Sequence, residues 1–183
     1  MRKLKLQVQT SIDGYIAGPN GEMDWMVWDW DDELKSFVTE LANPVDTILL
    51  GRKLAEGFIP HWSNAAQNPE TADDAARKFS ETPKVVFTTT LEEHRWPNTT
   101  LAKGDLVQTV TDLKNQPGGD LIAYGGAAFV SALLRHGLID DVYLFVNPVA
   151  IGQGLSIFDD RTHMKPAGAR VFPCGILLQH YKP

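Results

Sequence analysis

The chain has almost no cysteine and no long apolar run, and both absences narrow its possible environment. Cys174 is the one cysteine in 183 residues, so no disulfide can form within the chain and a reducing, cytoplasmic location is expected. No apolar run approaches the roughly 20 residues that a membrane helix needs. The first ten residues also lack the apolar block of a secretory signal. The sequence therefore predicts neither a membrane partner nor secretion.

Positive charge is also in short supply. The net charge of −6 disfavours broad nucleic-acid binding, because neutralising phosphates requires a basic surface. The histidines show no metal-ligand spacing, and no serine lies in the G-x-S-x-G setting of a hydrolase. The sequence thus predicts no nucleic-acid partner and no metal site.

The apolar segments that are present predict one domain over residues 1–183, since the chain is long enough for one full core and short for two. Strands are expected at 4–8, 47–50, 84–87, 106–107 (an edge strand), 120–124, 142–146 and in the tail, 169–181. Helices are expected at 31–42, 73–80, 111–115 and before Gly137, with a helical turn after Lys53 and a polar loop over 60–75.

The order of these elements predicts the fold class. Strands alternate with helices and the chain then ends in strands. This order is typical of an α/β domain with a mostly parallel central sheet, flanked by helices, and antiparallel C-terminal strands.

Three strand ends carry groups suited to a phosphorylated ligand, and ligands of open α/β sheets bind beyond the carboxyl ends of strands. They are the glycine and two cations of 51–53, the hydroxyls of 88–90 and the glycine pair before a helix at 124–128. A helix N-terminus there would offer N–H groups and a favourable dipole to an anion. Each feature alone has an ordinary explanation, as a tight turn or a solvated surface. Their agreement predicts a nucleotide site.

The usual dinucleotide signals are missing. No G-x-G-x-x-G follows the first strand, and no acid stands at a strand end where it would bind a ribose 2′-hydroxyl. Hydroxyls and cations take those places. This substitution favours a 2′-phosphorylated cofactor, NADPH.

Several motifs, in this order along nearly the whole chain, resemble a known family. They are Ser11–Ala17, Leu49–Arg52, Gly125-Gly126, Gly137–Asp141, Asn147–Val149 and Gly152–Gly154. With them the chain resembles the dihydrofolate reductase superfamily. Within it, the chain most closely resembles the reductase-domain family typified by the C-terminal half of the riboflavin-biosynthesis deaminase-reductase. The zinc motifs of the deaminase half, H-x-E and P-C-x-x-C, are absent from this sequence.

The resemblance implies an NADPH-dependent reductase with a dihydrofolate reductase-like fold. Its implied cofactor residues are Gly51, Arg52 and Lys53 at the phosphates, Thr88 and Thr89 at the adenosine ribose phosphate, and Tyr124, Gly125, Gly126, Ala127 and Ala128 at the pyrophosphate. Val8 and Gln9 would lie beside the nicotinamide, and Ile16 and Ala17 on the loop that covers it. Related reductase domains pair, so a homodimer is expected, with Tyr143–Val146 and the tail as contributors.

The acidic tryptophan segment, residues 22–33, combines three tryptophans with six acids. Trp25 matches a tryptophan that dihydrofolate reductases hold in this region. The carboxylate with which those enzymes bind the pterin has no clear counterpart, which argues against folate reduction, and Asp24, Asp29 and Asp31 are substitutes for it, with Asp24 also a candidate proton donor. The alternative interpretation is a helix N-terminus with favourable acids, packed by tryptophans.

The same acids bear on the substrate. They would repel a phosphate-bearing molecule, which favours a neutral or cationic flat heterocycle or carbonyl compound. The leading hypothesis is therefore reduction of a C=N or C=O bond of a small heterocyclic molecule by NADPH. The alternatives are the riboflavin-pathway 5-amino-6-(5-phosphoribosylamino)uracil reductase and a non-catalytic nucleotide-binding or dimerisation module.

Overall fold

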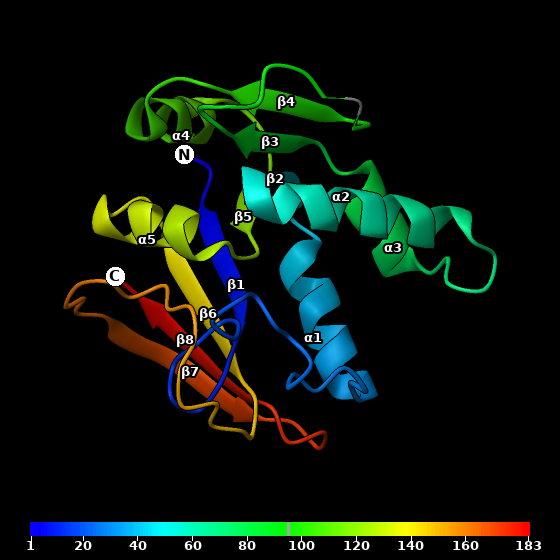
Figure 1. Cartoon of the computed structure of the whole chain (residues 1–183), viewed down its shortest axis with the longest axis vertical. Coiled ribbons are helices and arrows are strands. Elements are labelled where there is room, and N and C mark those ends of the chain that lie inside the picture. The colour runs from blue at the N-terminus through cyan, green and yellow to red at the C-terminus, as the bar shows by residue number, and fades with distance from the viewer. Residues whose placement is uncertain (95) are drawn as a thin grey trace.

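The computed structural model describes residues 1–94 and 96–183, in which eight strands form one sheet flanked by five helices (Figure 1). The strands are β1 (Leu4–Thr10), β2 (Val45–Gly51), β3 (Lys84–Phe87), β4 (Thr99–Ala102), β5 (Asp120–Ala123), β6 (Asp141–Val146), β7 (Lys165–Val171) and β8 (Leu177–Lys182). The helices are α1 (Asp32–Ala42), α2 (Arg52–Gln67), α3 (Asp74–Glu81), α4 (Leu106–Asn115) and α5 (Ala127–Arg135).

The strand order across the sheet is β4-β3-β2-β5-β1-β6-β8-β7. The first six strands in this order run parallel, and β8 and β7 pair antiparallel at one side. The predicted fold class is therefore confirmed. The parallel strands all end at one rim, called the carboxyl edge below.

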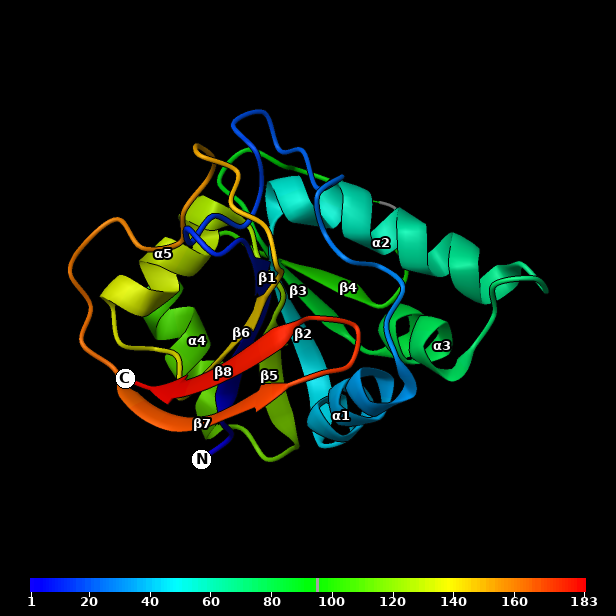
Figure 2. The same cartoon turned by 90° about the horizontal axis from the view of Figure 1, so that it is seen from below.

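Helices cover both faces of the sheet. Figure 2 shows α1, α2 and α3 on one face and α4 and α5 on the other. On the α4–α5 face, Val130 and Leu133 of α5 pack with Leu6 of β1 and Leu49 of β2. On the opposite face, Ile59 of α2 is buried with strand residues of β2, β3 and β5. Both faces of the central strands are thus buried, as expected for a parallel sheet.

The structure corrects the predicted loop over residues 60–75. Residues up to 67 belong to α2, so the helix continues through Pro60. Phe58 and Trp62 on this helix pack against Phe79 of α3, with ring centroids 5.8 and 4.4 Å apart. These aromatic contacts, together with the buried face of the helix, offset the hydrogen bond that a proline removes from a helix interior.

The predicted edge strand at 106–107 is also wrong. Leu106 begins α4 because the carboxylate of Asp105 accepts a hydrogen bond from the backbone N–H of Gln108, at 2.8 Å, and caps the helix. The helix therefore starts five residues before the predicted Thr111, and β4 is the edge strand on that side of the sheet.

The strand predicted as a dimer contact lies inside the sheet. The backbone of β6, which holds Tyr143–Val146, pairs with β1 on one side and β8 on the other. The tail supplies the edge instead, because β7 is the last strand and all seven of its residues are exposed.

Candidate functional site

The structure brings the three predicted strand ends together at the carboxyl edge. β3, β2 and β5 are neighbours in the sheet. Gly51 at the end of β2 pairs in register with Phe87 at the end of β3, and Leu49 of β2 pairs with Ala123 at the end of β5. The segments that follow these strands therefore leave the sheet side by side. Their role in binding stays a prediction.

Two helices start at this place without a capping side chain. Gly51 precedes α2 and Gly126 precedes α5 at the cap position, and neither helix has a side-chain cap or an acid in its first turn. The first N–H groups of a helix have no partner within the helix. At α2 and α5 they are left available to an anion, which the helix dipole also favours.

The glycines at these starts have geometric reasons. A side chain at Gly51 would place its first carbon 2.9 Å from Cβ of Phe129 in α5, so the glycine lets α5 approach the end of β2. Gly125 and Gly126 have φ angles of 144° and 84°, which side chains disfavour. The glycine pair thus turns the chain from β5 directly into α5.

The polar side chains predicted to bind phosphates differ in their exposure and in the hydrogen bonds that they already make. Lys53 is exposed, whereas Nη1 of Arg52 donates to Oε1 of Glu56 on the same helix, at 2.6 Å. Thr88 is buried, and its hydroxyl oxygen accepts the backbone N–H of Leu91 at 2.9 Å, so it caps a turn. Thr89 is exposed.

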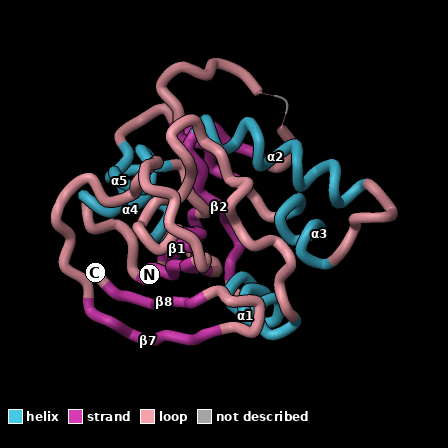
Figure 3. Tube along the Cα trace, turned by 60° about the horizontal axis from the view of Figure 1, so that its bottom comes forward, coloured by secondary structure: helices cyan, strands magenta, loops and turns pink. Residues whose placement is uncertain are grey.

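Two long loops lie side by side at the end of β1 and β6 (Figure 3). The N–H of Ile16 donates to the carbonyl of Leu155 at 2.8 Å, and the N–H of Leu155 donates to the carbonyl of Ala17 at 2.9 Å. A side chain at Gly154 would collide with that same carbonyl of Ala17. The covering loop that holds Ile16 and Ala17 is therefore joined to a second loop, over residues 147–158.

Asp13 makes a second connection between these loops. Its carboxylate accepts the N–H groups of Gly152, at 2.7 Å, and Ile151, at 3.2 Å. The hydrogen bond with the Ser11 hydroxyl and these N–H groups hold the pKa of Asp13 below its usual value, against a smaller desolvation effect. Asp13 therefore has a structural role in the loops.

The acidic tryptophan segment divides into structural and exposed groups. The Asp31 carboxylate caps α1 by accepting the N–H of Leu34, at 2.9 Å, and it also accepts the N–H of Cys174, at 2.8 Å. Desolvation works against ionisation there, but these hydrogen bonds outweigh it and lower the pKa of Asp31 to about 2. Asp24 and Asp29 are exposed. For Asp31, the structure therefore supports the alternative interpretation, an acid at a helix N-terminus.

The tryptophans of this segment are tied to its backbone. The half-buried Trp25 indole donates to the carbonyl of Glu22 at 3.1 Å, and Trp30 donates to the carbonyl of Val27 at 2.8 Å. Trp28 is 62% exposed. Exposed apolar side chains also occur on the adjoining loops, at Ile12 and Leu155. Apolar surface is thus left uncovered at the carboxyl edge, where a flat ligand can use it.

Two buried amides were missed by sequence reasoning. Asn147, at the end of β6, is fully buried, and its Nδ2 donates to Oε1 of Gln9 at 2.7 Å. Gln7 is 8% exposed, and its buried Oε1 has no partner among the residues that the structure describes. The available signal was the alternation of Lys5, Gln7 and Gln9, which puts polar side chains on a face that is buried because β1 is a central strand.

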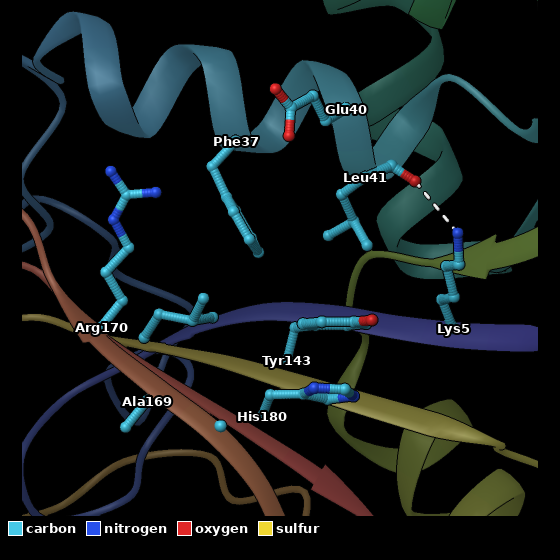
Figure 4. A pocket seen from close by; sticks show the side chains of 10 residues that line it. Lys5, Phe37, Glu40, Leu41, Tyr143, Ala169, Arg170 and His180 are labelled. Carbon is cyan, nitrogen blue, oxygen red and sulfur yellow. Dashed lines mark hydrogen bonds between the residues drawn. The ribbon is translucent and has the colours of Figure 1, made fainter.

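A separate cavity of about 480 Å³ lies between α1 and the β6, β8 and β7 strands (Figure 4). Tyr143 and His180 form its floor, with ring centroids 4.3 Å apart and planes 10° apart. Phe37 of α1 faces them, and Lys5 and Arg170 lie on opposite sides. Its lining includes none of the cofactor or substrate residues predicted from the sequence.

Within the described part of the chain, no helix has the length and apolar character needed to cross a bilayer. His, Cys, Asp and Glu side chains in these same residues form no group of three that would suit a metal ion.

Comparisons with known proteins agree with this architecture. The chain is 32% identical to the protein YyaP of Bacillus subtilis, over 96% of this chain and 92% of that protein. It superimposes on a diaminohydroxyphosphoribosylaminopyrimidine deaminase/5-amino-6-(5-phosphoribosylamino)uracil reductase of Thermotoga maritima with a TM-score of 0.70 and 21% identity, covering 100% of this chain and 56% of that one. Acinetobacter baumannii RibD gives a TM-score of 0.69 at 16% identity, with coverage of 100% and 58%.

These structural matches show the fold, which is that of the dihydrofolate reductase-like RibD reductase domains. The family itself is shown by sequence, since the RibD C-terminal domain matches residues 2–178. This chain therefore belongs to the RibD C-terminal domain family.

Proposed function

We propose that this protein is an NADPH-dependent reductase that delivers hydride to a C=N or C=O bond of a small heterocyclic molecule. The observation that carries the proposal is the pair of uncapped helix starts, α2 and α5, beside each other at the carboxyl edge. Arg52 and Lys53 stand at one of these starts, and no acid is present in the first turn of either helix. Such a surface suits the phosphates of a dinucleotide.

The residues at this edge fit NADPH, which would supply the hydride when bound. The N–H groups at the starts of α2 and α5 would hold the pyrophosphate, and Arg52 and Lys53 would meet the cofactor phosphates, the 2′-phosphate included. Thr88 and Thr89 would lie near the 2′-phosphate, and Val8 and Gln9 beside the nicotinamide. Ile16 and Ala17, on a loop joined to the 147–158 loop, would limit the access of water.

The substrate is proposed to bind on the α1 side of the carboxyl edge. Trp25 offers a flat apolar surface, and Asp24 and Asp29 remain the candidate acids, with Asp24 as the candidate proton donor. Asp31 is already engaged as a helix cap. A neutral or cationic flat heterocycle matches this set.

The family membership supports a second candidate substrate, the phosphoribosylaminouracil of the riboflavin pathway. The Thermotoga maritima structure that shares this fold is named as a reductase of that compound. Its phosphate would require cations near the pocket, whereas the adjoining segment carries six acids. The proposal therefore ranks a neutral or cationic substrate without a phosphate first.

The proposal includes a homodimer in the cytoplasm. The exposed edge strand β7 supports a contact through the tail, and the lone cysteine is compatible with a reducing compartment. A non-catalytic nucleotide-binding module is the remaining alternative.

A thermal-shift comparison of NADPH, NADP⁺ and NADH tests the cofactor. Stabilisation by about 2.7 kcal/mol is expected at a hundredfold excess of NADPH over its dissociation constant, with a smaller effect of NADH. NADPH oxidation is then followed with the phosphoribosylaminouracil and with neutral pteridines. Efficient turnover of the phosphoribosylaminouracil refutes the neutral or cationic substrate, whereas NADPH binding without turnover of any compound favours the non-catalytic module. No stabilisation by NADPH contradicts the proposal as a whole.

A further inference from the structure

Gln9 and Asn147 meet at the carboxyl edge, where β1 and β6 end side by side. Asn147 is fully buried and donates from Nδ2 to Oε1 of Gln9 at 2.7 Å. Its own Oδ1 accepts the backbone N–H of Val27 at 2.7 Å. Val27 belongs to the acidic tryptophan segment. One buried amide therefore joins two strand ends to the segment on the proposed substrate side.

The orientation of the Asn147 amide is fixed by backbone groups. A backbone N–H can only donate a hydrogen bond, and the N–H of Val27 faces Oδ1. Backbone carbonyls can only accept, and those of Thr10 and Phe145 lie 3.3 and 3.2 Å from Nδ2. Turning the amide by half a turn would set donor against donor and acceptor against acceptor. The network thus determines which side is nitrogen.

This orientation determines that of Gln9 in turn. Because Nδ2 of Asn147 only donates, Gln9 must present its oxygen there, and its NH₂ group points elsewhere. Gln9 is half-buried, and its NH₂ donates to no residue that the structure describes. Gln9 shares its sheet face with Gln7, since alternate residues of a strand point the same way. That face is the one covered by α1.

We propose that Asn147 is a positioning residue, and that the NH₂ group of Gln9, which it orients, donates a hydrogen bond to a carbonyl or imine acceptor of the substrate. This inference rests on the proposed function. When hydride from NADPH adds to the carbon of a C=O or C=N bond, the π electron pair moves onto the oxygen or nitrogen, which then takes a proton from water or from a carboxylate such as Asp24. A fixed donor at that atom stabilises the growing negative charge. The backbone of Gln9 remains available beside the nicotinamide.

Two substitutions separate the two ends of the Gln9 amide. Gln9→Glu keeps an oxygen for Asn147 but replaces the NH₂ donor with a second acceptor. Gln9→Met removes both polar ends and leaves Asn147 without its partner at 2.7 Å. The melting temperature should therefore stay near the wild-type value in Gln9→Glu and fall in Gln9→Met. Binding of an acceptor ligand should follow the opposite order.

The probe is 1,3-dimethyllumazine, a flat neutral heterocycle with carbonyl and imine acceptors and no N–H donor, titrated by fluorescence into the NADP⁺-saturated protein. Its dissociation constant should rise about tenfold in Gln9→Met, through loss of one hydrogen bond, and about a hundredfold in Gln9→Glu, where acceptor faces acceptor. 2,4-Diaminopteridine, which presents amino donors, should lose less affinity in Gln9→Glu than the dimethylated probe does.

Gln116→Glu, the same change at an exposed position after α4, should leave the dissociation constant of the probe unchanged. The inference is overturned if the variants rank in the same order by melting temperature and by affinity for the probe. It is also overturned if Gln9→Glu binds the probe as tightly as the wild type does, or if the NADP⁺-saturated wild type does not bind the probe. Absence of NADP⁺ and NADPH binding instead overturns the proposed function. The probe titration is then repeated without cofactor, and the same two orders still decide the role of Gln9.

Discussion

The helices of this protein begin in two different ways. The aspartates Asp31, Asp73 and Asp105 cap α1, α3 and α4, each accepting a backbone N–H of the first turn. α2 and α5 begin at glycines and have no such cap. All helices have the same unpaired N–H groups to satisfy. Where the chain supplies its own carboxylate the need is met internally, and where it supplies glycine no side chain at the cap position meets it.

The largest effect is expected when an acid is placed at an uncapped start. Ala128 and Ala75 are both exposed alanines at the second position of their helices, α5 and α3. Ala128→Asp should weaken NADPH about a hundredfold, because a carboxylate would stand near the cofactor phosphates at an effective dielectric of about 20. Fluorescence titration measures the dissociation constant of NADPH, and Ala75→Asp is the matched control. Equal NADPH affinity in the two variants would contradict a phosphate site at α5.

A smaller effect is expected from removing a cation at the other uncapped start. Arg52→Ala should weaken NADPH about tenfold and NADH less, because a charge-assisted hydrogen bond to phosphate is lost. Arg77→Ala is the control, since Arg77 also pairs with an acid on its own helix, Asp74, at 3.3 Å. Equal losses for NADPH and NADH would remove the role assigned to Arg52 at the 2′-phosphate.

Removing a cap should affect stability alone. Asp105→Ala deletes the carboxylate that accepts the N–H of Gln108 and should lower the free energy of unfolding by about 1 kcal/mol. Urea denaturation measures this loss, and the dissociation constant of NADPH should not change. A weaker affinity for NADPH would show that the capped starts are not independent of the site.

The smallest expected effect is a pH dependence of the stability that Asp31 contributes. The pKa of Asp31 is lowered from 3.8 to about 2 in the folded protein, so its cap contributes fully above pH 4 and is lost as the pH falls through 2. Asp31→Asn has no charge to titrate. The difference in stability between wild type and variant should therefore shrink between pH 5 and pH 2 in denaturation curves. A constant difference would contradict the charged cap.

Much of the fold was predictable because its signals are local. The alternation of residues 4–8, the acids at the helix start after Asp31 and the strand, glycine pair and helix at 120–135 each identify an element from a few neighbours in sequence. The errors arose where distant contacts decide. Pro60 lies in a helix because aromatic residues of α2 pack on α3, and no local pattern contains that information.

Part of the candidate site was also predictable from the sequence. The carboxyl ends of parallel strands share one edge, so the meeting of Gly51, Thr88 and Tyr124 followed from the fold class alone. Gln7 and Asn147 were missed because their importance depends on burial. Polar residues on an alternating strand normally face water, and only the central place of β1 puts Gln7 inside. Asn147 follows β6, and its partners Gln9 and Val27 lie far away in sequence. Asp31 was overestimated as a ligand residue because its second partner, the N–H of Cys174, lies far away in sequence.

The pairing of the covering loop with the 147–158 loop has a kinetic consequence. With Asp13 and the Ile16–Leu155 contacts in place, neither loop can swing outward by itself. Under the proposed function, admitting or releasing a ligand beneath them would be one cooperative motion of two chain segments, of the kind that takes microseconds to milliseconds in enzymes. A substitution in either loop would therefore change the rate at which both loops open and close together.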